Sequence, residues 1–293
     1  MSAAAASSQP PRGAGAAGTE PRIASAFAQA AAQRRAAFIP YLTAGDPSAD
    51  VTVETAIALE RAGADVLELG VPFSDPIADG PVLQRSAARA LAAGGSLSRV
   101  FEMAGRIRAQ TGLALVLFSY LNPLLRSGLP ESAAEARRAG FDGVLVTDLP
   151  PEEASAYRPA LTRAGLDTIF LVSPTSPPRR MLAAARLSTG FLYVVSRSGI
   201  TGARTALDPE LARTAARARR AAPRLPRAIG FGISTPEAAR VAAGMAEGVV
   251  VGSALVRAGE EAVLAGRDPA AAVATLAARL AAACVRTRPE SAG

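Results

Sequence analysis

RAGADVLELG, residues 61–70, combines the two signals that decide the fold. Gly63 stands where a helix must end in a left-handed turn, and the apolar run after it predicts a strand. The same arrangement returns in RAGFDGVLV, residues 138–146, and in RAGLDTIFLV, residues 163–172. A helix that ends at glycine and leads into a strand is the αβ connection expected of repeated βα units around a parallel sheet.

From Ile23 onward, short apolar runs alternate with longer helical stretches along the whole chain. The predicted strands are residues 37–42, 66–69, 114–118, 143–146, 168–172, 192–195, 228–231 and 249–251. Eight βα units in roughly 250 residues favour a (β/α)₈ TIM barrel of the α/β class. The alternative, a Rossmann-like sheet, lacks a G-x-G-x-x-G after the first strand. Locally, we expect a helix over residues 51–62 with Asp50 as its N-cap.

Two residue types are absent, which limits the reactions that this chain can catalyse. The sequence has no lysine and no histidine, so all 32 basic residues are arginine. This excludes a Schiff base, a P-loop lysine, a Ser-His-Asp triad and the usual zinc sites, and we expect no metal. Acid–base chemistry must use Asp, Glu, Tyr or Cys284. Because Cys284 ends an alanine-rich helical stretch, we expect a buried small residue rather than a catalytic thiol.

Composition also bounds the partners and the compartment. The net charge is +7, but the arginines are scattered along helical stretches and aromatic residues are only 4%, so no nucleic-acid partner is expected. Charges interrupt every long apolar stretch, which predicts a soluble protein without a membrane span. A single cysteine excludes an intrachain disulfide and suits a reducing compartment, so we expect a cytoplasmic protein.

The chain divides into three parts by composition. Residues 1–22 are rich in Ala, Ser, Gly and Pro and predict a disordered leader, for which organelle targeting is a minor alternative. Residues 23–285 form the predicted catalytic barrel, and residues 286–293 a flexible tail.

Carboxylates gather where the second predicted strand ends, in LELGVPFSDPIADGP, residues 67–81. The active site of a TIM barrel lies at the carboxyl ends of its strands. Glu68 stands inside an apolar strand, where an unpaired carboxylate is costly. It is therefore either paired with arginine or backbone N–H groups, or it is an acid–base group whose pKa is raised by burial.

Glycine-rich loops follow the later strands. They are SRSGITG (residues 196–202), GFGIS (residues 230–234) and VGSALV (residues 251–256), and the last opens a short helix at Ser253. Backbone N–H groups of such loops and of a helix N-terminus form the usual phosphate site of this barrel. The sequence therefore predicts a phosphorylated substrate.

Taken together with FIPYLTAGDP (residues 38–47), YLNP (residues 120–123) and VTDLPPEE (residues 146–153), these motifs resemble the tryptophan synthase α-subunit. The likeness runs from about Ile23 to Ala283. It implies a lyase of tryptophan biosynthesis that cleaves indole-3-glycerol phosphate to indole and glyceraldehyde 3-phosphate by a retro-aldol reaction.

The resemblance also implies roles for individual residues. Glu68 matches the general acid–base residue, and Asp79 matches the carboxylate that engages the indole N–H. The side chains expected to line the substrate site are Tyr41, which stands where Phe is frequent, Tyr120, Tyr193 and Thr201. The phosphate-binding positions are Gly202, Gly232, Gly252 and Ser253. Thr201 belongs to a loop, residues 197–207, that would close over the substrate and bring it to Asp79.

The resemblance further implies a partner. The family works with a β-subunit as an α₂β₂ heterotetramer, and the β-subunit receives indole. Asp75 and Asn122 match the docking surface. Pyridoxal phosphate is expected only on the β-subunit, and no cofactor on this chain. Two alternatives remain: a free-standing indole-3-glycerol phosphate lyase, and a non-catalytic barrel that serves as a partner.

Overall fold

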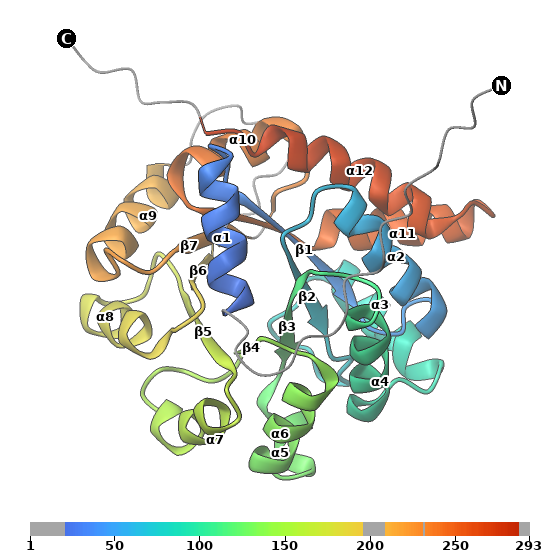
Figure 1. Ribbon diagram of the computed structural model, residues 1–293, viewed down its shortest axis with the longest axis horizontal. Coiled ribbons are helices and arrows are strands. Elements are labelled where there is room, and N and C mark those ends of the chain that lie inside the picture. Colours follow the sequence, from blue (N-terminus) through green and yellow to red (C-terminus); the bar gives the residue numbers. More distant parts are fainter. Residues whose placement is uncertain (1–20, 196–208, 231, 287–293) are drawn as a thin grey trace, which may run out of the picture.

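A closed barrel of parallel strands forms the centre of the molecule (Figure 1). The structure is a computed structural model that describes residues 21–195, 209–230 and 232–286. The strands pair in chain order and are β1 (Ala37–Thr43), β2 (Val66–Gly70), β3 (Ala114–Ser119), β4 (Gly143–Val146), β5 (Asp167–Val172), β6 (Leu192–Val195), β7 (Arg227–Gly230) and β8 (Gly248–Val251). The predicted TIM barrel is confirmed, and each strand begins and ends within one residue of its predicted position.

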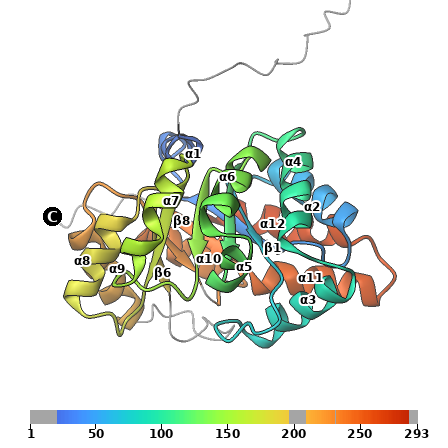
Figure 2. The ribbon, with the colours of Figure 1, turned by 90° about the horizontal axis from the view of Figure 1, so that it is seen from below.

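Helices surround this barrel (Figure 1). They are α1 (Arg22–Ala32), α2 (Ala49–Arg61), α3 (Pro81–Ala92), α4 (Leu97–Arg108), α5 (Leu121–Arg126), α6 (Leu129–Ala139), α7 (Arg158–Arg163), α8 (Pro178–Leu187), α9 (Pro209–Ala221), α10 (Pro236–Met245), α11 (Ser253–Leu264) and α12 (Pro269–Ala283), with a 3₁₀ turn η1 (Ala154–Ala156). Figure 2 shows α1 at one end of the barrel, with α3 and α11 at the other.

Local signals account for most helix ends. The three glycines of the repeated RAG segments, Gly63, Gly140 and Gly165, have φ of 98°, 99° and 72°, as the left-handed turn requires. The expectation that Asp50 caps α2 is wrong. Ser48 is the N-cap, and its hydroxyl accepts a hydrogen bond from the N–H of Val51 at 3.2 Å. The helix therefore starts one residue before Asp50, which lies in its first turn.

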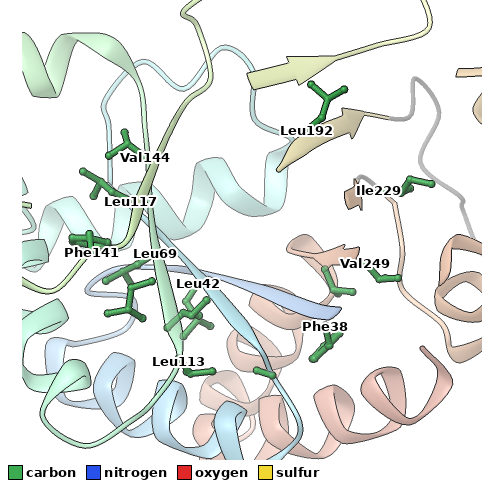
Figure 3. Close-up of a cluster of buried hydrophobic side chains, with 14 of the residues drawn as sticks. Phe38, Leu42, Leu69, Leu113, Leu117, Phe141, Val144, Leu192, Ile229 and Val249 are labelled. Carbon is green, nitrogen blue, oxygen red and sulfur yellow. The ribbon is translucent and has the colours of Figure 1, made fainter. Parts of the chain in front are cut away.

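Two apolar layers result from the alternation of side chains along each strand. Side chains such as Phe38, Leu69 and Val249 point outward and pack under the helices (Figure 3). The alternate residues, among them Ile39 and Val116, fill the barrel interior, where α1 contributes to the same cluster. Glu68 lies between two outward-facing leucines of β2, so its side chain enters the interior layer.

The ends of the described chain bear on the predicted domain limits. Arg22, expected as the last leader residue, is the first residue of α1, and residues 1–20 lie outside the description. The predicted tail is described only at Arg286. Cys284 is buried at the end of α12, and burial raises the pKa of its thiol to about 12, which agrees with a structural role. No helix in the described part is long and apolar enough to cross a membrane.

Candidate active site

Glu68 is the central carboxylate of the barrel interior. Its side chain is on β2 with only 1% exposure, and its register neighbours are Tyr41 on β1 and Val116 on β3. Within the described chain, its Oε1 atom has no hydrogen-bond partner. Burial alone raises the pKa of this carboxyl to about 8, because no cation of the described chain offsets the lost hydration. Glu68 therefore carries a proton near neutral pH and can both give and take one.

Asp79 lies on the connection from β2 to α3, where hydrogen bonds to its backbone N–H and carbonyl groups fix its position. Its N–H donates to the carbonyl of Pro76 at 3.0 Å, and its carbonyl accepts from the amide of Gln84 at 2.9 Å. The hydroxyl of Tyr120 accepts from the N–H of Ala78 at 3.0 Å and donates to the Asp79 carboxylate. Burial raises the pKa of Asp79 to about 6, and the Tyr120 hydrogen bond limits that rise. Near neutral pH this group is largely a carboxylate.

Two buried tyrosines, Tyr41 on β1 and Tyr193 on β6, lie near Glu68 in the barrel interior. The hydroxyl of Tyr41 lies over Gly70, where an added Cβ would be 2.1 Å from it, and that of Tyr193 lies over Gly230 at the same distance. Strands β2 and β7 therefore end in glycine, at Gly70 and Gly230, which leaves room for the two hydroxyls. The sequence analysis did not identify this role, although a glycine at the end of a strand is a sign of a close approach. Burial raises the pKa of both phenols, assisted by the charge of Asp79 at Tyr41 and of Glu68 at Tyr193.

Three of the expected phosphate positions, Gly232, Gly252 and Ser253, follow the carboxyl ends of the neighbouring strands β7 and β8. Gly232 follows β7 with φ of 79° and is exposed, and Gly252 is the N-cap of α11, which starts at Ser253. At the start of α11 the N–H groups of Leu255 and Val256 donate to the carbonyl of Gly252, at 2.9 Å and 3.2 Å, so the donors left without an acceptor inside the helix are those of Gly252, Ser253 and Ala254. The first turn of α11 holds no acidic residue. Gly252 also packs beside Tyr41, since an added Cβ would be 3.6 Å from the Tyr41 Cβ. Gly202 and Thr201 lie outside the described residues.

The residues expected at a partner surface lie on the same end of the barrel. Asp75 and Asn122 are both exposed, on the β2–α3 connection and on α5. Between Asp75 and Asp79, the side chain of Ile77 is 87% exposed. An exposed isoleucine beside the carboxylate loop is a feature that sequence reasoning did not identify.

A separate cavity of about 110 Å³ lies beside this site rather than in it. It is bounded by β1, α2, α11 and α12, and its lining is mostly aliphatic. Its walls include neither Glu68 nor Asp79, so it plays no part in the chemistry of the two carboxylates.

Comparison with known proteins agrees with this geometry. The family described as "Tryptophan synthase alpha chain" matches residues 27–285. A tryptophan synthase alpha chain of Solibacter usitatus is 53% identical over 225 residues, which cover 77% of this chain and 84% of the relative. That of Geobacter sulfurreducens is 46% identical over 257 residues, 87% of this chain and 97% of the relative. The chain belongs to the tryptophan synthase alpha chain family.

Solved structures of tryptophan synthase agree over nearly the whole barrel. The alpha subunit from Legionella pneumophila has a TM-score of 0.84 at 39% identity and covers 90% of this chain and 98% of its own. A tryptophan synthase structure from Mycobacterium tuberculosis has a TM-score of 0.82 at 34% identity and covers 91% and 99%. A tryptophan synthase alpha chain is a lyase that cleaves indole-3-glycerol phosphate in tryptophan biosynthesis, and the family works with a β-subunit.

Proposed function

We propose that Glu68 carries out the proton transfers of indole-3-glycerol phosphate cleavage and that Asp79 holds the indole N–H. The observation that carries this assignment is the burial of Glu68 without a cation from any described residue, which keeps its carboxyl protonated near neutral pH. The more exposed Asp79 retains a lower pKa and serves as the charged partner. Two carboxyl groups with pKa values moved to different extents suit one acid–base role and one electrostatic role.

The protons balance in two steps. The Glu68 carboxyl donates its proton to C3 of the indole ring, and the Asp79 carboxylate stabilises the positive charge that develops on the ring nitrogen. The bond between C3 and the glycerol chain then breaks, and its electrons return to the ring. The neighbouring hydroxyl loses its proton to the Glu68 carboxylate and becomes the aldehyde of glyceraldehyde 3-phosphate. Glu68 is again protonated, and indole is released.

We assign the phosphate of the substrate to the N–H groups at Gly232, Gly252 and Ser253, with Gly202 as a further predicted contact. The absence of lysine supports this, because backbone dipoles must then supply most of the neutralisation. The contact between Gly252 and Tyr41 supports a substrate that spans the site from the phosphate to the ring.

For the assembly, we infer an α₂β₂ heterotetramer in the cytoplasm, in which Asp75 and Asn122 contact the β-subunit. Both residues are exposed beside the site, and the exposed Ile77 adds apolar surface there. Pyridoxal phosphate belongs in this proposal to the β-subunit alone.

The test is to incubate the purified chain with indole-3-glycerol phosphate, with and without a β-subunit, and to measure indole. We expect slow release from the chain alone and faster release with the partner. Fast release that a β-subunit does not change would instead indicate a free-standing lyase. No release under either condition would refute the proposed chemistry.

A further inference from the structure

Helices α3 and α11 are joined by a group of ion pairs at the site end of the barrel (Figure 2). Glu260 of α11 accepts from Arg85 of α3 at 2.9 Å and 2.7 Å, and from Arg89 of α3 at 2.6 Å. Arg89 also makes a bidentate contact with Asp46, at 2.8 Å and 2.7 Å. We call these four residues the Glu260 clamp.

The carboxylates of the clamp are better shielded than that of an ordinary surface pair, although Arg85 is 53% exposed, about as much as Arg106 at 49%. The side chains of Glu260 and Asp46 are 14% and 10% exposed, against 76% for Asp50 in the Asp50–Arg106 pair. Hydrogen bonding by Arg85 first, and by Arg89, holds the pKa of Glu260 at about 2. Glu260 is therefore charged throughout the pH range in which the enzyme could work.

The two helices carry the two halves of the proposed site. α11 begins at Ser253, where the phosphate is assigned, and α3 begins at Pro81, two residues after Asp79. Arg85 lies in the middle of α3, Arg89 in its last turn, and Glu260 in the second half of α11, so the ion pairs do not involve the N-terminal turn of either helix. Displacement of α11 along its axis would therefore reach the Asp79 segment through Glu260 and the two arginines.

The packing next to the clamp is not continuous. The cavity of about 110 Å³ lies directly against Glu260, Arg89 and Asp46, so the space below them is not filled by side chains. The ion pairs are therefore one connection between the two helices, beside the apolar cluster in which Val82 and Leu83 of α3 and Val256 of α11 take part.

We propose that Glu260, Arg85 and Arg89 are positioning residues that couple the phosphate end of the site to Asp79. This inference rests on the proposed function. A phosphate bound at the first turn of α11 fixes that helix, and the clamp passes the constraint to α3 and to the carboxylate that holds the indole N–H. Binding of the phosphate moiety and of the ring should consequently be cooperative, beyond the sum of their separate contacts.

The experiment measures the Kd of indole by titration calorimetry, with and without saturating glycerol 3-phosphate, in the full chain. We expect glycerol 3-phosphate to tighten indole binding by about fivefold or more, the lower range of typical coupling. In Glu260→Gln the ratio of the indole Kd without glycerol 3-phosphate to the Kd with it should fall towards one, while the Kd of each ligand alone changes little. Asp50→Asn is the matched control, because it removes a carboxylate from an ion pair between other helices.

The effect of a variant on folding can be separated from its effect on the cooperative binding of the two ligands. Ser86 of α3 is also bonded to Thr43 of β1 at 2.7 Å, so α3 stays attached when Glu260 is changed. Should Glu260→Gln fail to fold, Arg85→Gln removes one exposed arginine and should reduce the coupling in part. Wild-type coupling in these variants, or none in the wild type, would overturn the inference. Failure of the phosphate site is detected independently, as an unchanged glycerol 3-phosphate Kd in Gly232→Val.

Discussion

Replacement of Glu68 by glutamine is expected to remove catalysis and to stabilise the barrel at alkaline pH. The folded protein has a pKa of about 8 for this group, against 4.5 for an ordinary glutamate. Between these values the folded chain keeps a proton that the unfolded chain has lost. The free energy of unfolding therefore falls as pH rises, by up to about 1.4 kcal/mol per pH unit. The Glu68 contribution is complete below pH 4.5 and is lost as pH rises to about 8.

From pH 5 to pH 8 this amounts to about 3 to 4 kcal/mol. Glutamine does not titrate, so the stability of Glu68→Gln relative to the wild type should increase by that amount over the same interval. Urea unfolding of both proteins at the two pH values measures the difference. Glu54→Gln, at an exposed position of α2, is the control and should follow the wild type.

The same variant should lose about 10² to 10⁴ in kcat, the usual contribution of an acid–base group, because an amide cannot transfer a proton. Its circular dichroism should be unchanged, because glutamine has nearly the same shape. Parallel pH dependence in the two proteins would show that Glu68 does not carry its proton in the fold. Near-normal turnover would show that another group moves the protons.

Three further changes test other parts of the site. Tyr120→Phe removes the hydrogen bond that limits the pKa of Asp79. The acid limb of the pH profile of kcat/KM, expected near pH 6, should therefore move to higher pH. An acid limb at the same pH in both proteins would contradict the contact between Tyr120 and Asp79. Gly232→Val forces a β-branched residue to a φ of 79° and blocks the phosphate. In steady-state kinetics, KM should rise about tenfold or more, with a smaller change in kcat. An unchanged KM would place the phosphate elsewhere. Gly230→Ala puts a Cβ 2.1 Å from the hydroxyl of Tyr193 and should cost about 1 to 3 kcal/mol in urea unfolding, partly restored by adding Tyr193→Phe; full stability in the single variant would show that the ring has room to move.

Local residue patterns were sufficient for the architecture. Apolar runs predict all eight strands to within one residue, and the glycines of the three RAG segments mark the turns before β2, β4 and β5, because helix ends and strand alternation depend on neighbours in the chain. The misplaced N-cap of α2 shows the limit of such signals. Both Ser48 and Asp50 can cap a helix, and backbone geometry decides between them.

The sequence by itself also limited the chemistry available, since without lysine and histidine the proton transfers fall to Asp, Glu, Tyr or Cys284. The resemblance carried by the LELGVPFSDPIADGP motif then pointed to Glu68 and Asp79. Only the tertiary structure shows that Glu68 is buried with its Oε1 atom unpartnered among the described residues, which raises its pKa, because a pKa depends on the groups that surround the side chain. The approach of Tyr193 to Gly230 and the contact of Glu260 with Arg85 join residues 37 and 175 positions apart in the chain. Barrel closure brings such residues together, and no local pattern records which distant side chains will meet.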